Sequence, residues 1–313
     1  MSLSLDFPKS PSFLQPSQLI ANLLQPKASL AELTSYRVGG QAEWLAAPRT
    51  IDELYACLEW AGQRELPITV IGAGSNLLIS DRGLPGLVLN TRRFRGSALD
   101  ADTGLLTAFA GESIVKVAYK AAKQGLQGLE WAVGIPGTVG GAVVMNAGAH
   151  NACTADVFES VEILTADGRL ATLTRDELQF SYRHSALQGS GAIVLQAMFQ
   201  LETGGIPAEI TAKTSDNLHL RKSTQPYELP SCGSVFRNPL PQAAGWLVEQ
   251  TGLKGFRIGG AQVAERHANF IVNIEKARAN DVLALIRHVQ AEVKSRWSVD
   301  LHPEVKLLGK FSV

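Results

Sequence analysis

Four stretches of the chain place apolar residues at the spacing of an amphipathic helix. Residues 50–62 begin with the capping-box sequence T-I-D-E and end at a glycine. Residues 113–125 begin with a serine that can cap a helix, and they also stop at a glycine. A third helix is expected from residue 207 towards 221, with proline in its first turn, and a fourth through 282–293, with Asn280 as its cap.

Shorter apolar runs bounded by turn residues predict strands. The run 68–71 is typical of a buried strand, and Asp167-Gly168 between two apolar runs is the strongest hairpin signal in the chain. Near the end of the chain the apolar residues alternate, which directs Glu304 away from the apolar face. Strands are therefore expected at 68–71, 77–79, 161–164, 170–173, 193–201 and 301–307.

The length of 313 residues predicts about two domains, at ~150 residues each. Prolines at positions 8, 11, 16 and 26 interrupt any long periodic pattern, so residues 1–29 are expected to be a loosely docked N-terminal extension. The turn sequence Thr203-Gly204-Gly205 is a natural boundary. It divides a first domain, 30–204, from a second, 205–313.

Composition and charge exclude several classes of protein. With 45% hydrophobic and 19% charged residues, the chain can bury a substantial core and is expected to be globular. Its formal net charge is zero, so the charge pattern of a nucleic-acid-binding protein is missing. The sequence predicts neither a secretory signal nor a membrane span. The three cysteines form no C-x-x-C pair, which fits a protein of the reducing cytoplasm. The spacing of the histidines does not indicate a metal site.

Two glycine-rich segments are candidates for phosphate binding. Gly72-x-Gly74 follows a predicted strand, but residue 77 is leucine and another strand follows, so a dinucleotide-binding fingerprint is not supported. This loop is either a plain hairpin or a backbone cradle for an anion. A second segment, 134–141, has the same character, and the two together indicate one extended ligand that contains a pyrophosphate.

Three polar segments between apolar runs also invite a functional interpretation. Residues 181–185 form either a solvated turn or a site that contains Arg183, and 231–239 form either a Ser-Gly turn or a turn that presents Ser234 as a proton donor. The second segment lacks the G-x-S-x-G pattern of hydrolases. Glu304 stands in an apolar run, where a carboxylate is expected to be either paired or used in chemistry.

In order along the chain, these segments resemble the UDP-N-acetylenolpyruvoylglucosamine reductase family. Any one motif is weak, but the ordered set over roughly residues 30 to 308 is highly specific. The matching segments are 35–40 (S-Y-R-V-G-G), 70–76 (V-I-G-A-G-S-N), 134–141 (G-I-P-G-T-V-G-G), 182–185 (Y-R-H-S), 232–239 (C-G-S-V-F-R-N-P) and 302–305 (H-P-E-V).

The resemblance implies an α+β protein. An FAD-binding domain of the vanillyl-alcohol-oxidase type would be followed by a smaller α/β substrate-binding domain, in a cytoplasmic monomer. Its partners would be a UDP-sugar and NADPH, with neither nucleic acid nor membrane. FAD would transfer hydride from NADPH to the enolpyruvyl group of UDP-N-acetylglucosamine enolpyruvate, which yields UDP-N-acetylmuramate for peptidoglycan.

The resemblance also implies roles for individual residues. Ser234 would protonate the enol intermediate as general acid, and Arg183 and Glu304 would stabilise its negative charge. The residues implied to bind the cofactor are Tyr36, Arg37, Gly72, Gly74, Ser75, Asn76, Gly134, Gly137, Thr138, Gly141, Asn146 and Gly148, and those implied to bind the substrate are Gln225, Arg237 and Asn238.

One feature departs from the longer members of the family. They carry an inserted loop, after the arginine motif, whose tyrosine closes over the substrate diphosphate, whereas here only residues 186–192 precede the next strand. The chain is therefore similar to the shorter type. Two alternatives stay open: another oxidase or dehydrogenase of the same flavin fold, and a non-catalytic flavin- or nucleotide-binding protein.

Overall fold

The computed structural model describes residues 16–311, which separate into two compact units that alternate along the chain. Unit 1 comprises the described part of Met1–Leu24 together with Ala46–Ala73 and Leu89–Arg221. Unit 2 comprises Gln25–Leu45, Gly74–Val88 and the described part of Lys222–Val313. The domain limits expected at residues 29 and 204 remain predictions.

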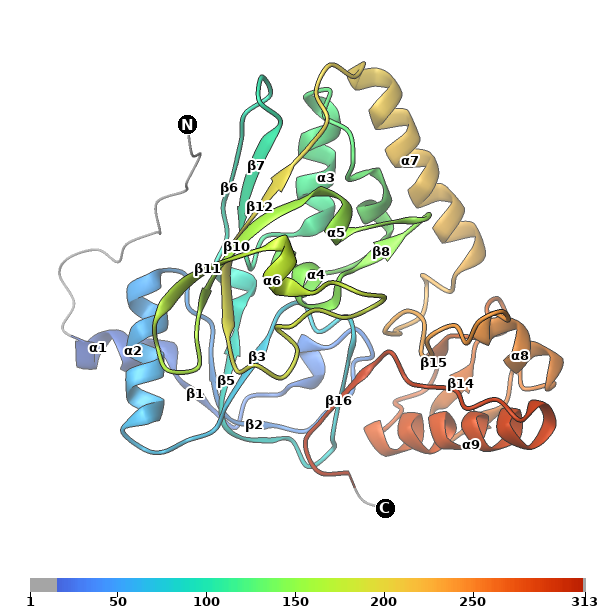
Figure 1. The fold of residues 1–313 in the computed structure, drawn as a ribbon. Helices are drawn as coiled ribbons and strands as arrows, with labels where there is room; N and C mark the ends of the chain where they lie inside the picture. Colours follow the sequence, from blue (N-terminus) through green and yellow to red (C-terminus); the bar gives the residue numbers. More distant parts are fainter. Residues whose placement is uncertain (1–15, 312–313) are drawn as a thin grey trace. The chain divides into compact units, whose positions relative to one another are not determined.

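Unit 1 is organised around a five-stranded antiparallel sheet of order β11-β10-β12-β7-β6 (Figure 1). Helices α3 and α4 contribute apolar side chains to the same core as this sheet. The strands are β6 (Ser97–Leu99), β7 (Leu105–Phe109), β10 (Phe158–Leu164), β11 (Leu170–Thr174) and β12 (Ile193–Gln200), with β3 (Ile68–Ile71) and the small pair β8 (Gly148–Ala149) and β9 (Ala152–Cys153) elsewhere in the unit. The helices are α1 (Pro16–Leu23), α2 (Ile51–Gly62), α3 (Ile114–Lys123), α4 (Val139–Met145), α5 (Thr154–Val157), α6 (Arg175–Leu178) and α7 (Pro207–Thr224), with 3₁₀ turns at Thr91–Arg93 and Glu130–Gly134.

Unit 2 contains small sheets and one long helix. In Figure 1, α9 runs along the three-stranded sheet β13-β14-β15, and seven of its side chains are buried. The helices are α8 (Ala244–Gln250) and α9 (Ala279–Trp297), with a 3₁₀ turn at Ala31–Leu33. The strands are β1 (Gln25–Pro26), β2 (Ala42–Ala46), β4 (Leu77–Ile79), β5 (Leu84–Asn90), β13 (Arg257–Ile258), β14 (Ala261–Val263), β15 (Ile271–Asn273) and β16 (Lys306–Leu308). Strands β1, β2 and β5 are neighbours in one sheet, and β16 pairs in parallel with β4.

The helix predictions are confirmed in place and type, and two of the predicted caps are also confirmed. The Glu53 N–H donates to Thr50 Oγ1 at 3.1 Å at the start of α2, and the Lys116 N–H donates to Ser113 Oγ at 3.4 Å at the start of α3. Asn280 as the cap of α9 is wrong, because the helix already begins at Ala279.

The start of α9 is capped both locally, where the Asp281 carboxylate accepts the Arg278 N–H at 2.9 Å, and from far away in sequence. The carboxylate of Asp81 accepts the N–H groups of Ala279 and Asn280 at 2.8 and 3.0 Å. Two N–H groups of the first helical turn are thus satisfied from a loop almost two hundred positions earlier, which no local sequence pattern could reveal.

The hairpin at Asp167-Gly168 is confirmed, with Leu164 opposite Leu170, and so is the strand predicted at 193–201. The burial predicted for 68–71 is wrong, since Ile68 and Val70 are 40% and 39% exposed. The strand predicted over 301–307 is shorter than expected, because β16 starts only at residue 306. Leu307 is exposed there, although the alternation predicted it to be buried.

The predicted N-terminal extension, residues 1–29, falls partly outside the described residues, which begin at position 16. Its described part contains helix α1 and the short strand β1, which pairs with β2. The α+β class is confirmed by the antiparallel main sheet of unit 1 and by the mixed helix and strand content of the chain.

Candidate active site

The two glycine-rich segments come together within unit 1 at Gly72 and Thr138. A Cβ on residue 72 would lie 2.5 Å from Thr138 Oγ1, so only glycine allows this approach. Thr138 is itself buried and caps α4, since its Oγ1 accepts the Gly141 N–H at 3.3 Å. The sequence predicted only that these two segments bind one extended ligand, and the structure places Gly72 of the first against Thr138 of the second.

The second segment lies against the start of α3. The N–H groups of Val139 and Gly140 donate to the carbonyl oxygens of Glu112 and Ala110, both at 2.9 Å. A Cβ on residue 140 would lie 2.9 Å from the Ala110 Cβ. The segment is therefore fixed by backbone contacts that larger residues would prevent.

The residues of unit 1 fit the pyrophosphate of a dinucleotide such as FAD. Gly72, Gly137 and Gly141 bring no side chain to this surface, and all three are accessible to solvent. The N–H groups of residues 139–141 bond within the protein, so the other backbone N–H groups of these loops and the Thr138 hydroxyl are the donors that they could present to phosphate oxygens.

Arg183 lies with two predicted cofactor residues of unit 1. Its guanidinium donates to the carbonyl oxygen of Gly148 at 2.8 Å and lies 5.1 Å from the centre of the Tyr182 ring. The adjacent turn is held by Asn146, whose side chain donates to the Ser181 carbonyl at 3.0 Å and accepts the Ala155 N–H at 3.0 Å. The segment 181–185 is thus anchored to the glycine-rich region and is more than a solvated turn.

Arg221 is a basic residue of unit 1 that the sequence analysis missed. It lies over Gly134, where a Cβ would come within 1.9 Å of the Arg221 Cδ. Partial burial lowers the pKa of His150, and the nearby Arg221 guanidinium lowers it further. A positive charge thus stands beside the second glycine segment. The sequence offers no signal for this, because Arg221 reaches the loop only through the packing of α7.

In unit 2, the continuation of the first glycine loop is equally constrained. Gly74 has φ +66°, and a Cβ there would lie 1.9 Å from the Leu33 carbonyl oxygen. Its own carbonyl accepts the Ser35 N–H at 3.1 Å. Ser75 and Asn76 follow directly, so they are presented from a turn that only glycine can form.

In unit 2, the segment that carries Ser234 pairs through its backbone with the segment that carries Glu304. The Glu304 N–H donates to the Val235 carbonyl at 2.7 Å, and the Arg237 N–H donates to the His302 carbonyl at 2.9 Å. The Asn76 side chain donates to the Glu304 carbonyl at 3.3 Å. Glu304 and Asn76, two predicted site residues, are therefore hydrogen-bonded, and Ser234 is the chain neighbour of Val235, which bonds to Glu304.

Positive charge gathers next to Glu304. Burial lowers the pKa of Lys306, and the nearby Arg237 guanidinium lowers it further. The Glu304 carboxylate raises this pKa, but by less. The Nε of Arg237 is buried without a hydrogen-bond partner among the described residues. The sequence analysis identified Arg237 but missed Lys306, which follows Glu304 by two positions.

The remaining predicted residues of unit 2 have distinct surroundings. The Gln225 carbonyl accepts from Arg266 at 3.1 Å, and the Asn238 side chain accepts the Ala244 N–H at 3.0 Å. Arg37 is exposed, with φ +56°. The Tyr36 ring is fully buried in the core of unit 2, and within residues 16–311 its hydroxyl has no hydrogen-bond partner.

Cys232, which precedes Ser234 by two residues, is 5% exposed, and its Sγ donates to the Leu77 carbonyl at 3.3 Å. Burial raises the pKa of this thiol to about 12. It is therefore a protonated core residue at neutral pH.

Among the described residues, no group of three or more His, Cys, Asp or Glu side chains is arranged to hold a metal ion.

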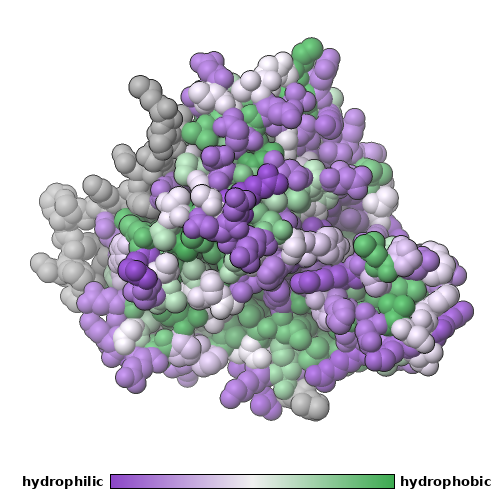
Figure 2. Space-filling view, in the orientation of Figure 1, coloured by the Kyte–Doolittle hydropathy of each residue, from purple (hydrophilic) through white to green (hydrophobic). Residues whose placement is uncertain are grey.

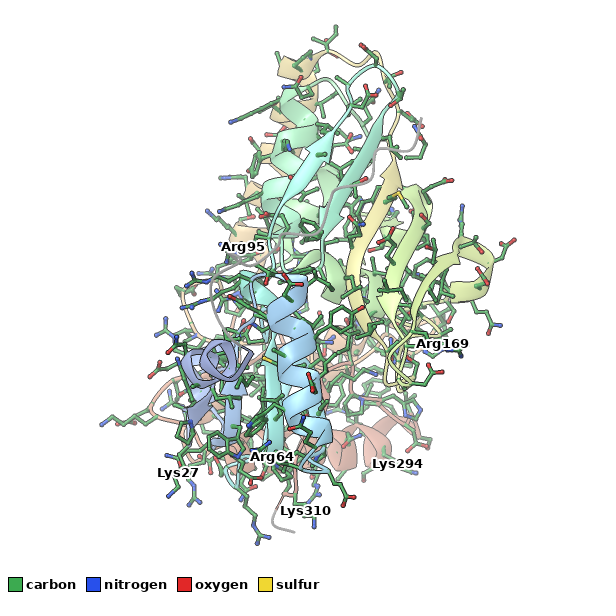
Figure 3. All side chains as sticks on the ribbon, turned by 90° about the vertical axis from the view of Figure 1, so that its left-hand side faces the viewer. Lys27, Arg64, Arg95, Arg169, Lys294 and Lys310 are labelled. Atoms are coloured by element: carbon green, nitrogen blue, oxygen red, sulfur yellow. The ribbon has the colours of Figure 1, made fainter. Side chains whose placement is uncertain are left out.

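The basic residues labelled in Figure 3 come from separate elements: in unit 1, Arg64 just follows α2, and Arg169 lies in the β10–β11 turn. Arg169 is paired with Asp167 at 2.7 Å.

On the face drawn in Figure 2, hydrophilic and hydrophobic residues are interspersed. None of the helices over residues 16–311 is long and apolar enough to span a membrane.

Comparison with known proteins places both parts of the chain. Residues 42–174 match a family model described as an FAD binding domain, and residues 225–308 match the C-terminal domain of UDP-N-acetylenolpyruvoylglucosamine reductase. The UDP-N-acetylenolpyruvoylglucosamine reductase of Trichormus variabilis is 59% identical over 288 residues, which cover 92% of this chain and 87% of that protein. The protein of the same name from Synechococcus sp. WH7803 is 61% identical over 92% of this chain and 94% of its own length.

The fold agrees with these matches. The crystal structure of UDP-N-acetylenolpyruvylglucosamine reductase from Thermus caldophilus superposes with a TM-score of 0.77 at 37% identity, and covers 90% of this chain and 98% of that chain. The chain belongs to the UDP-N-acetylenolpyruvoylglucosamine reductase family, and carries an FAD-binding domain followed by the C-terminal domain of that family.

Proposed function

We propose that this chain catalyses the NADPH-dependent reduction of UDP-N-acetylglucosamine enolpyruvate to UDP-N-acetylmuramate, a step of peptidoglycan precursor synthesis. The observation that carries the proposal is the hydrogen bond from the Glu304 N–H to the carbonyl of Val235, the residue next to Ser234, in a member of this family. FAD, reduced by NADPH, would supply a hydride for the terminal carbon of the enolpyruvyl double bond. The electron pair of that double bond then moves towards the substrate carboxylate.

The chain's own residues are proposed to handle the resulting charge and proton. Arg183 and Glu304 stabilise the aci-carboxylate form of the substrate, since positioned charged and hydrogen-bonding groups act most strongly where charge develops. Ser234 Oγ donates its proton to the carbon adjacent to the carboxylate, and a C–H bond forms as the O–H bond breaks. A serine hydroxyl is a weak acid at neutral pH, so this transfer depends on accurate placement.

The other predicted residues are proposed to bind. The glycine loops, with Thr138, Ser75 and Asn76, would hold the FAD pyrophosphate, and Tyr36, Arg37, Asn146 and Gly148 would support them. Gln225, Arg237 and Asn238 would contact the substrate. Because this chain is similar to the shorter members of its family, the half-buried cations Arg237 and Lys306 are the side chains that we expect to face its diphosphate.

The test is an anaerobic visible spectrum of the purified protein. We expect an oxidised flavin band that bleaches with NADPH and returns when the enolpyruvyl sugar nucleotide is added without oxygen. A band that returns only with oxygen would favour a different flavin oxidase, and FAD-reconstituted protein without a band would refute the cofactor itself. NADH in place of NADPH tests the preferred reductant, sedimentation tests the proposed monomer, and cell fractionation tests the proposed cytoplasmic location.

A further inference from the structure

The turn that carries Ser234 has little secondary structure to hold it. Residues 230–239 include neither a helix nor a named strand, and Gly233 has φ +75°. On one side the turn pairs with the segment around Pro303 through a single bridge at Phe236. A proton donor that depends on accurate placement needs further support on the other side.

Asn269 provides that support through three hydrogen bonds. Its Oδ1 accepts the Phe236 N–H and its Nδ2 donates to the Phe236 carbonyl, both at 2.9 Å. Its own carbonyl accepts the Val235 N–H at 2.8 Å. The side-chain amide thus occupies both backbone polar groups of Phe236, as a neighbouring strand would.

Asn269 is itself held in place. It is 4% exposed, and its backbone N–H donates to His267 Nδ1 at 3.2 Å. Phe236 is 2% exposed, so loss of the amide would leave two buried backbone groups without partners. The turn would then shift or open, while its bonds to residues 302–304 hold only the other side.

We propose that Asn269 is a positioning residue for the proton transfer: it fixes the Val235–Phe236 backbone and thereby aims the Ser234 hydroxyl beside Glu304. This inference rests on the function proposed above. Asn269 does not contact the reacting atoms, and it acts through the backbone of the turn. Displacement of a catalytic group by about 1 Å can cost ~10²-fold in rate, whereas the reduction of bound flavin by NADPH does not use Ser234.

The test separates the two half-reactions in Asn269→Ala. We expect NADPH to reduce the flavin within about threefold of the wild-type rate, and reoxidation by the enolpyruvyl sugar nucleotide to slow by ~10- to 10²-fold. The solvent deuterium isotope effect on reoxidation should rise, because proton transfer becomes slower relative to hydride transfer. Asn269→Asp keeps an acceptor for the Phe236 N–H, and its reoxidation rate should lie between those of the wild type and Asn269→Ala.

Gln262→Ala is the matched control. Gln262 is another buried side-chain amide of unit 2, and its Nε2 donates to the Gly255 carbonyl at 3.1 Å, within the β13–β14 region. Its loss should lower the melting temperature without separating the half-reactions. Equal slowing of both half-reactions in Asn269→Ala, an unchanged isotope effect, or the same separation in Gln262→Ala would overturn the inference.

A second variant covers the case in which Asn269→Ala does not fold. Asn269→Asp is then compared with the wild type by the same half-reactions, and a wild-type reoxidation rate would also overturn the inference. If the wild type itself is not reoxidised by the enolpyruvyl sugar nucleotide without oxygen, the proposed function fails instead. The two failures are therefore distinguishable.

Discussion

The contact between Gly72 and Thr138 allows a test of how the two glycine segments are joined. In Gly72→Ala, the new Cβ would lie 2.5 Å from Thr138 Oγ1, well inside van der Waals contact, and the φ of residue 72 is not in the left-handed region. The expected cost is therefore steric. Overpacking of this kind costs ~1–3 kcal/mol of unfolding free energy.

Thr138→Ala removes the atom that the new methyl group would meet. Alone, it should cost ~1 kcal/mol, because α4 loses its side-chain cap. If the two effects were independent, the double variant would lose ~2–4 kcal/mol. Since the next Thr138 atom, Cβ, is 3.6 Å from the new methyl group, the double variant should instead lose little more than Thr138→Ala alone.

The assay is urea denaturation of the four proteins with and without FAD, together with flavin titration to measure binding. The double-mutant cycle should give a coupling of ~1–3 kcal/mol, and FAD affinity should fall most in Gly72→Ala. Gly62→Ala is the control, because a Cβ on residue 62 would meet no heavy atom within 4 Å, and Gly62 lies at the end of α2. Additivity within ~0.5 kcal/mol would refute the contact as the reason for glycine at position 72.

Four further predictions follow from other parts of the molecule. Ser234→Ala should leave flavin reduction by NADPH nearly unchanged and slow product formation by orders of magnitude in single-turnover kinetics; normal reoxidation would remove Ser234 from the mechanism. Glu304→Gln should separate the half-reactions in the same way, by ~10²–10³-fold, and equal damage to both would indicate misfolding. Asp81→Ala should lower the unfolding free energy by ~0.5–2 kcal/mol through the lost cap of α9, and an unchanged melting temperature would contradict that role. Burial raises the pKa of Cys57 and of Cys232 from 9.0 to about 12. The unfolded chain therefore releases these protons at a lower pH than the folded chain does. Stability should fall above pH 9 by up to ~1.4 kcal/mol per pH unit for each thiol, until pH 12, and replacement of either cysteine by serine should reduce that slope.

Local chemistry predicted the elements of this fold well. The caps Thr50 and Ser113 could be predicted because each side chain bonds an N–H group only three residues further along the chain. The hairpin at Asp167-Gly168 is equally local. The prediction failed for α9, where the cap comes from Asp81, and for Ile68 and Val70, whose exposure depends on what packs around the strand.

The candidate site divides in the same way between local and distant information. Ser234, Glu304 and the glycine loops could be predicted as site residues because they lie in short sequence motifs. Asn269, Arg221 and Lys306 were missed, since each acquires its place only through packing against a segment distant in sequence or through the charge that gathers around it. A motif therefore predicts which side chains could react, whereas the residues that position those side chains can be found only from the tertiary structure. The half-reactions of the Asn269 variants measure that difference most directly.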